Sequence, residues 1–180
     1  DLSRGMVELA KEKMPVFHQR FDISLGDAEN LPFSNAVFDA IVCVSTMHYF
    51  ADTGRSLTEF SRVLKEKGVF VCGDLTLHES DTRHFLDTLE RTLSKAHAQY
   101  YKPSEMKKLI EDHGFCVSQL KVIPYRKFFV SLVEDKGKYF NVKAEALNEC
   151  LERATKDERN LYSINNNELT LFYTLITALR

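Results

Sequence analysis

Glycine is scarce in this sequence, with 7 glycines among 180 residues, and none of them forms a G-x-G-x-x-G or G-x-x-x-x-G-K-[ST] motif. The chain as given therefore lacks a phosphate-cradling glycine loop. The 4 cysteines form no C-x-x-C pair, which argues against a zinc ribbon or disulfide framework and favours the reduced thiols of a cytoplasmic protein. We expect no metal site, because no two histidines are spaced i,i+4.

Charge imbalance and long apolar runs are also missing. The net charge is −2, from 24 basic and 26 acidic residues, so no basic field points to nucleic acid. No apolar run approaches the ~20 residues that a membrane helix needs, and we expect no membrane insertion. Tryptophan is absent, but 13 Phe and 7 Tyr provide ample core material. This length and composition predict a single domain over residues 1–180.

Two apolar, β-rich runs joined by an amphipathic helix predict a βαβ unit. Phe38–Val44 and Val69–Leu75 are nearly continuous apolar runs, as in strands buried on both faces. A helix from about Gly54 to Lys65 lies between them, and Gly68 is the expected residue after its end. A right-handed crossover then makes the two strands adjacent and parallel.

The remaining segments complete a three-layer α/β domain. Pro124 is expected to end one strand, and residues 128–133 fit either helix or strand. We expect a helical insertion at about 124–168, with a turn at 165–167. The other expected elements are helices over 2–14, 81–93, 103–114 and 144–155, and strands over 21–26, 115–123 and 169–179.

Four motifs in order carry a family resemblance. They are GDAENLPF at 26–33, FDAIV at 38–42, MHYF at 47–50 and EFSRVLKEKG at 59–68. Together they resemble the class I S-adenosylmethionine-dependent methyltransferases (methyltransferase type 11), and more narrowly the ubiquinone/menaquinone-biosynthesis methyltransferases. The resemblance implies a Rossmann-like sheet whose last strand is antiparallel.

The family's first strand, its glycine-rich loop and the following helix have no counterpart here. The family sheet order is 3-2-1-4-5-7-6, so we expect this domain to be N-terminally incomplete and the natural chain to extend upstream. We expect the 180 residues alone to bind cofactor poorly and to transfer no methyl group. We also expect them to be unstable or to self-associate, because two sheet edges would be exposed. Comparing the chain with a version extended upstream tests this expectation.

The resemblance also assigns cofactor-binding roles. Asp1 would accept from the ribose hydroxyls; alternatively it is a frayed terminal residue or a helix cap. Asp27 would accept from the adenine amino group while the Ala28 amide meets a ring nitrogen; alternatively Asp27 forms an Asx-turn. Leu2 and Met6 would line the adenine ring, or simply pack their helix.

Polar residues follow both strands of the predicted βαβ unit, at the sheet edge where ligands of such folds bind. The resemblance places Ser45 and His48 under the methionine end of the cofactor. His48 is the candidate base, because imidazole titrates near neutrality, or a structural histidine. Asp74 and His78 either face the substrate pocket or lie in a solvated loop.

The function that the resemblance implies is transfer of a methyl group from S-adenosyl-L-methionine to a small, partly apolar substrate, leaving S-adenosyl-L-homocysteine. The substrate pocket would come from residues 76–103 and from the insertion, with Tyr100 and Tyr101 as walls or as core. Two alternatives remain: a non-catalytic binding or scaffold protein of this fold, and a nicotinamide-dependent oxidoreductase. The sequence names neither the acceptor nor the oligomeric state.

Overall fold

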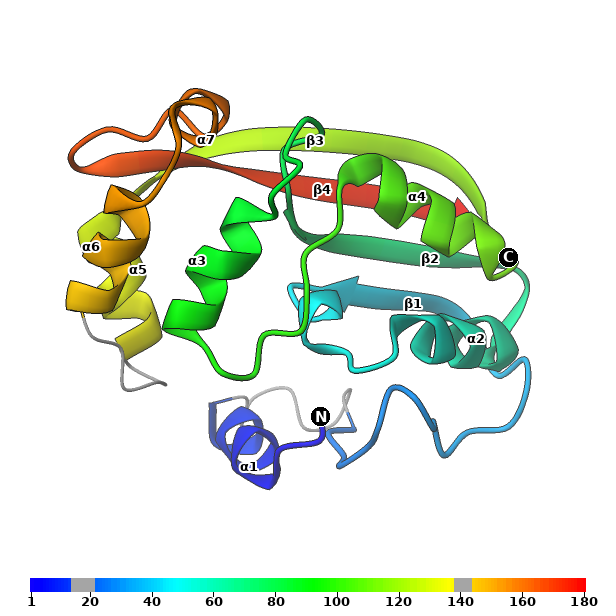
Figure 1. Cartoon of the computed structure of the whole chain (residues 1–180). Helices are drawn as coiled ribbons and strands as arrows, with labels where there is room; N and C mark the ends of the chain where they lie inside the picture. Colours follow the sequence, from blue (N-terminus) through cyan, green and yellow to red (C-terminus); the bar gives the residue numbers. More distant parts are fainter. Residues whose placement is uncertain (14–21, 138–143) are drawn as a thin grey trace.

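The computed structural model describes residues 1–13, 22–137 and 144–180 (Figure 1). In these ranges no helix has the length and apolarity needed to cross a lipid bilayer. In chain order the elements are α1 (Arg4–Lys13), β1 (Phe38–Val44), the 3-10 helix η1 (Met47–Tyr49), α2 (Thr53–Val63), β2 (Leu64–Thr76), α3 (Phe85–Leu93), α4 (Pro103–Asp112), β3 (Cys116–Phe128), α5 (Phe129–Gly137), α6 (Ala144–Glu152), α7 (Lys156–Leu161) and β4 (Glu168–Leu179).

The four described strands form one sheet in the order β1-β2-β4-β3. β1 and β2 are parallel neighbours, with Ile41 opposite Phe70, and α2 crosses between them. β4 is antiparallel to both β2 and β3. The predicted βαβ unit and the antiparallel last strand are thus confirmed, although β2 begins at Leu64, five residues earlier than expected.

One face of the sheet is covered by α2 and α4, which lie in front of the strands in Figure 1. The amphipathic stripe of α2 supplies Leu57 and Phe60, and α4 supplies Met106 and Ile110. From the sheet, Phe70 and other buried side chains at alternating strand positions pack against these helix residues. Burying each of these large side chains stabilises the fold by about 1.5–3 kcal/mol.

A second core lies at the carboxyl ends of β1 and β2, on the left in Figure 1. There α3, α5, α6 and α7 pack around the sheet end through mostly aliphatic side chains. Tyr162 is fully buried at its centre, and its hydroxyl donates to Asp81 Oδ2 at 2.6 Å. Leu75 and Leu171 reach this cluster from the face opposite Phe70.

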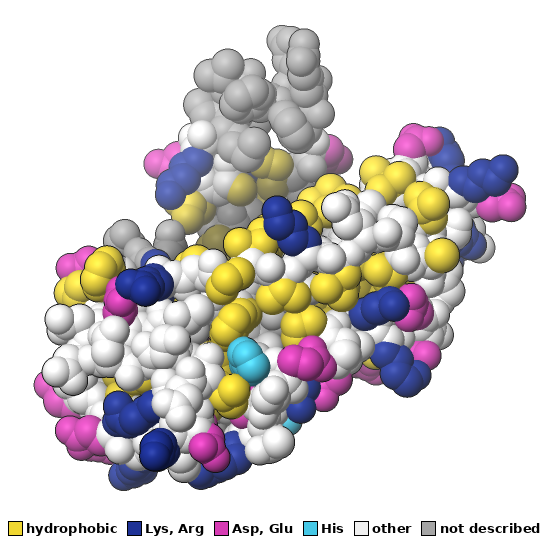
Figure 2. Space-filling view, turned by 90° about the horizontal axis from the view of Figure 1, so that it is seen from above, with side chains coloured by type: hydrophobic (Ala, Val, Ile, Leu, Met, Phe, Trp, Pro, Cys, Tyr) yellow, Lys and Arg dark blue, Asp and Glu magenta, His cyan; other side chains and the backbone are white. Residues whose placement is uncertain are grey.

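Pro124 does not end its strand, contrary to the sequence prediction. β3 continues to Phe128, and Pro124 pairs with Phe172 of β4. β3 is an edge strand of the described sheet, so a residue without an N–H group is tolerated where that group would face outward. Figure 2 looks down on this side of the molecule and shows hydrophobic side chains interrupted by charged ones, an arrangement that discourages edge-to-edge pairing.

Two other expectations need correction. Residues 22–26 form no strand, because no described strand lies beside them. Phe21, the first residue of that expected strand, and Met14, the last residue of the expected helix over 2–14, fall outside the described residues. The helix predicted to reach Thr155 ends at Glu152, and Thr155 instead caps α7, which the sequence analysis missed. The Thr155 side chain accepts from the Glu158 amide, as in a capping box.

Candidate active site

The segment after residue 26 forms a tight turn. Asp27 Oδ1 accepts from the Glu29 amide at 2.9 Å, which is the Asx-turn that the sequence analysis held as an alternative. No described residue donates to Asp27 Oδ2, and the side chain is half-buried. The turn therefore uses one carboxylate oxygen and leaves the other available to a ligand.

Arg62 of α2 fastens this segment to the domain. Its guanidinium donates to the backbone oxygens of Leu31 and Phe33 at 3.0 and 2.7 Å. It also pairs with both carboxylate oxygens of Glu59 at 2.7 Å, and Glu59 in turn accepts from the Leu31 amide at 2.8 Å. The hydrogen bonds from Arg62 lower the pKa of Glu59 to about 2. The motif residues at 59–62 thus fix the position of the turn.

Asp1 lies beside the residues that precede the turn. The Gly26 amide donates to the Asp1 carbonyl oxygen at 3.0 Å, and the Asp1 nitrogen donates to the Ser24 oxygen at 3.2 Å. Asp1 Oδ1 accepts from the Ser3 amide at 2.8 Å, and Ser3 Oγ accepts from the Met6 amide at the start of α1. Ser3 is therefore the helix cap. The backbone hydrogen bonds bring Asp1 next to the turn.

The hydrophobic residues expected to line the adenine ring lie on the surface. Leu2 is 70% exposed and Met6 is 46% exposed, so neither packs its helix against the core. Ala28 is half-buried and packs against the core under α2 and α4. The exposed Leu2 and Met6 side chains thus form apolar surface that faces solvent.

A sharp bend ends β1. Ser45 has a φ of 51°, a left-handed conformation that is uncommon for serine, and its amide donates to the Gly73 oxygen at 2.7 Å. Ser45 is exposed, whereas His48, three residues later on η1, is only 5% exposed. The bend thus separates a solvent-facing serine from an inward-facing histidine at the same sheet edge.

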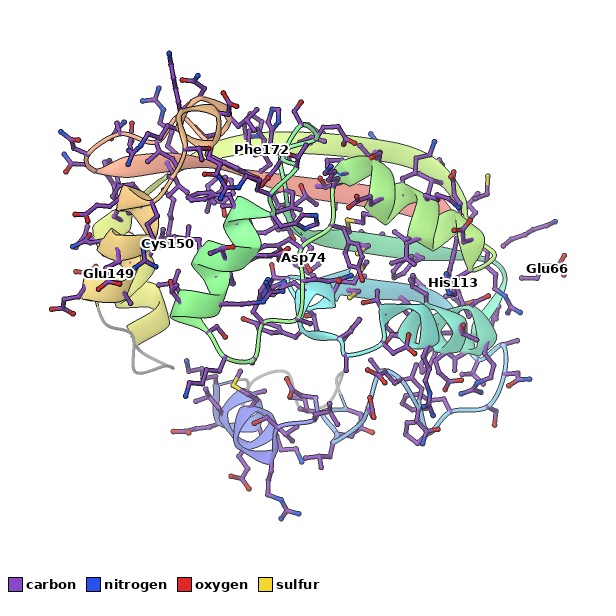
Figure 3. The ribbon with its side chains drawn as sticks, in the orientation of Figure 1. Glu66, Asp74, His113, Glu149, Cys150 and Phe172 are labelled. Carbon is purple, nitrogen blue, oxygen red and sulfur yellow. The ribbon has the colours of Figure 1, made fainter. Side chains whose placement is uncertain are left out.

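His48 forms a buried pair with Asp74 from the end of β2. Its Nδ1 lies 2.7 Å from Asp74 Oδ1, and its backbone amide donates to Asp74 Oδ2 at 3.1 Å. The Leu75 amide donates to Asp74 Oδ1 at 2.8 Å. Figure 3 labels Asp74 near the middle of the molecule. A carboxylate that accepts from Nδ1–H leaves Nε2 as the proton-accepting nitrogen of the ring.

Asp74, near the end of β2, and His78, just beyond it, have different surroundings. Asp74 is buried, so the alternative that it lies in a solvated loop is wrong. The alternation along β2, which points Phe70, Cys72 and Asp74 to the same face, is the sequence signal that could have indicated its burial. His78 Nδ1 accepts from the Ser80 amide at 3.1 Å within its own turn. The structure therefore joins Asp74, and not His78, to His48.

A second histidine–aspartate pair, which the sequence analysis missed, lies next to the first. His97 Nε2 lies 2.7 Å from Asp87 Oδ1, which also accepts from the Tyr100 amide at 2.6 Å. Burial alone would raise the pKa of Asp87, but these hydrogen bonds hold it below its ordinary value. The Tyr100 ring lies 5.2 Å from the His48 ring between centroids, and burial raises the pKa of its hydroxyl.

A cavity of about 160 Å³ adjoins this cluster. Tyr100 forms part of its wall, as does Leu75, the residue after Asp74. The other walls come from α3, from the predicted insertion and from the ends of β3 and β4, so the structure brings together both segments expected to build a substrate pocket. Its lining residues are Leu75, Leu86, Leu89, Glu90, Leu93, Tyr100, Tyr125, Lys127, Leu132 and Leu171.

Comparison with known proteins supports the resemblance. Residues 1–72 match a family model described as a methyltransferase domain. The uncharacterized methyltransferase YcgJ of Bacillus subtilis is 33% identical over 109 residues, which cover 58% of this chain and 42% of YcgJ. The demethylmenaquinone methyltransferase of Thermotoga maritima is 29% identical over 140 residues, covering 66% of this chain and 58% of that protein. The chain thus spans about half the length of these relatives.

The fold is shared with solved structures over nearly the whole chain. A Bacillus halodurans protein proposed to be a methyltransferase superposes with a TM-score of 0.89 at 22% identity, covering 99% of this chain and 80% of its own. The YcgJ structure superposes with a TM-score of 0.83 at 22% identity, covering 100% and 80%. The [4+2]-cyclase SpnF shares the fold with a TM-score of 0.71 at 16% identity, covering 99% and 63%, so the fold alone does not fix the reaction. The family-model match over residues 1–72 and the sequence relatives, on this common fold, support the resemblance to the class I S-adenosylmethionine-dependent methyltransferases.

Proposed function

We propose that the protein transfers a methyl group from S-adenosyl-L-methionine to a small, partly apolar acceptor. The observation that carries the proposal is the buried His48–Asp74 pair at the carboxyl ends of two parallel strands, next to a mostly apolar cavity. Ligands of open parallel sheets bind at this edge. A histidine held by a carboxylate is an arrangement suited to accepting a proton from an acceptor there.

The residues around the turn suit the adenosine end of the cofactor. Asp27 Oδ2 would accept from the adenine amino group, the Ala28 amide would donate to a ring nitrogen, and Asp1 would accept from the ribose hydroxyls. Leu2 and Met6 offer exposed apolar surface to the ring. The segment at Asp1 is hydrogen-bonded to the segment that holds Asp27 and Ala28, so both carboxylates and the amide provide a donor and acceptor set that fits an adenosine group.

When bound, the cofactor supplies an activated methyl group on a sulfonium. The acceptor's lone pair forms a bond to the methyl carbon while the carbon–sulfur bond breaks, and that electron pair stays on the sulfur of S-adenosyl-L-homocysteine. The protein's main task is alignment, which contributes up to about 7–11 kcal/mol in such displacements. Ser45 would contact the methionine end.

His48 takes the acceptor's proton. Asp74 fixes the ring with Nδ1–H toward its carboxylate, so Nε2 accepts, and the carboxylate then stabilises the imidazolium. This role requires an acceptor that carries a proton at the working pH. A nucleophile without one would need only alignment.

Calorimetry tests the cofactor, with S-adenosylmethionine and NAD as ligands; it uses the version of the chain extended upstream, because the 180 residues alone are expected to bind cofactor poorly. We expect binding of S-adenosylmethionine and none of NAD; the reverse would indicate an oxidoreductase. Transfer of a radiolabelled methyl group to candidate acceptors should then fall roughly 10²–10⁴-fold in His48→Ala. The matched control is His113→Ala, because His113 lies at the end of α4, away from Asp74. Equal losses in both variants would contradict the role of His48.

A further inference from the structure

The short helix that carries His48 has little stability of its own. η1 is a single 3-10 turn of three residues, and the Thr46 side chain before it makes no capping hydrogen bond. The internal hydrogen bonds run from the Tyr49 and Phe50 amides to the residues three positions earlier. Turns of this kind have poorer hydrogen-bond geometry than an α-helix. The position of His48 therefore depends on contacts from outside η1.

A loop at residues 97–100 supplies such contacts. The Ala98 amide donates to the His48 backbone oxygen at 2.9 Å. The Tyr100 ring packs against the His48 ring, with the centroids 5.2 Å apart. On the other side, the His48 amide donates to Asp74 Oδ2 at 3.1 Å. The backbone of His48 is thus held between the 97–100 loop and the end of β2.

Asp87 of α3 fastens this loop at both of its ends. Its Oδ1 accepts from the Tyr100 amide at 2.6 Å and lies 2.7 Å from His97 Nε2. The His97 side chain is fully buried, and within the described part of the chain its Nδ1 has no hydrogen-bond partner. The hydrogen bond that holds the His97 ring is therefore the one to Asp87. Removing it would leave buried polar groups without partners, which favours opening of the loop.

We infer that Asp87 and His97 are positioning residues for His48, because they close the 97–100 loop over η1 and thereby keep the His48 ring directed at Asp74. Neither residue needs to touch the methyl acceptor for this role. The inference rests on the proposed function, in which His48 accepts the proton. It adds that the orientation of His48 depends on a second histidine–aspartate pair, on α3 and the loop that follows it.

Two substitutions of His97 test the inference in the version of the chain extended upstream. His97→Leu removes the donor to Asp87, whereas His97→Gln offers an NH2 group in its place. In His97→Leu we expect the Ala98 amide to exchange with solvent roughly tenfold faster or more, because the loop that holds it opens. We also expect nitrogen NMR of the His48 ring to show the Nδ1–H tautomer giving way to a mixture, since the bond to Asp74 selects that tautomer. His97→Gln should restore native behaviour in both measurements.

His84→Asn is the matched control, because it removes an imidazole from the other oxygen of the same carboxylate. His84 Nδ1 lies 3.1 Å from Asp87 Oδ2, and the His84 side chain is 51% exposed. Asparagine tolerates the left-handed backbone of this position, where φ is 54°. We expect this variant to keep the native Ala98 exchange and the native His48 tautomer.

The Val37 amide, which donates to the Val63 oxygen at the opposite end of β1, is the reference for general opening. Native Ala98 exchange and a native His48 tautomer in His97→Leu would overturn the inference. Exchange that rises equally at Val37 and Ala98 would overturn it too, because the effect would then be a general loss of stability, and so would a failure of His97→Gln to restore the native signals. If these signals change as expected but the native protein transfers no radiolabelled methyl group from S-adenosylmethionine, the positioning of His48 stands and the proposed function fails.

Discussion

Replacing Asp74 by asparagine removes one charge and exchanges one oxygen for an NH2 group in a buried site. The Asp74 carboxylate accepts three N–H groups, two at Oδ1 and one at Oδ2. An asparagine with its oxygen at the Oδ1 position keeps the bonds from His48 Nδ1 and the Leu75 amide. Its NH2 group then faces the His48 amide, so one buried donor loses its acceptor.

The expected loss of stability follows from the number of buried N–H donors that lose their acceptor. One buried N–H group without a partner costs about 1–3 kcal/mol, and the opposite orientation of the amide would cost more because two donors lose their acceptor. We therefore expect Asp74→Asn to lower the free energy of unfolding by about 1–3 kcal/mol. Methyl transfer should fall by roughly 10²-fold or more, since a neutral amide stabilises the His48 imidazolium less well.

Urea unfolding followed by circular dichroism measures the first effect, and methyl-transfer assays across pH measure the second. The control is Asp39→Asn, because the Asp39 side chain is 86% exposed on β1 and should leave both quantities unchanged. An Asp74→Asn protein with native stability would refute the three-donor geometry. Native activity at every pH would refute the pairing as part of the proposed function.

Three further predictions concern the turn, the ion pair and the sheet. In the upstream-extended protein, Asp27→Ala should weaken S-adenosylmethionine binding by about 1–3 kcal/mol in calorimetry, and equal affinities would leave Asp27 only its structural role. The pKa of Glu59 falls from 4.5 to about 2 in the fold, so its bond with Arg62 stabilises the protein above about pH 4.5 and is lost as the pH falls toward 2; Glu59→Gln should flatten urea stability over that window. A Cβ at Gly73 would lie 2.6 Å from Tyr173 Oη, so Gly73→Ala should cost about 1–3 kcal/mol in thermal melts, and less when Tyr173 is replaced by leucine.

The sequence predicted the βαβ unit well because the signals for it are local. Two continuous apolar runs around an amphipathic helix leave one common arrangement, and Phe38–Val44 forms β1 with its predicted ends. Pro124 was misjudged because the effect of a proline depends on whether its strand is at the edge. The position of a strand within a sheet is set by tertiary pairing, which no local pattern contains.

The candidate site was predicted only in part, because local patterns do not contain the tertiary contacts that complete it. His48 stood out as a polar residue directly after a buried strand, but its partner lies 26 residues further along the chain. The Asp87–His97 pair depends on a loop that folds back over η1, where the Ala98 amide donates to the His48 oxygen at 2.9 Å. Hydrogen bonds between loops follow from the completed packing, so spacing alone did not indicate them.

The place of β4 in the sheet constrains the order of events during synthesis. β4 is the last strand in sequence, yet it lies between β2 and β3 and pairs with both. A nascent chain that has not yet emerged through residue 179 therefore holds β2 and β3 without the strand that joins them. Because such non-local pairing closes late and leaves strand edges exposed, this interval is when the emerging chain is most prone to aggregate or to need a chaperone.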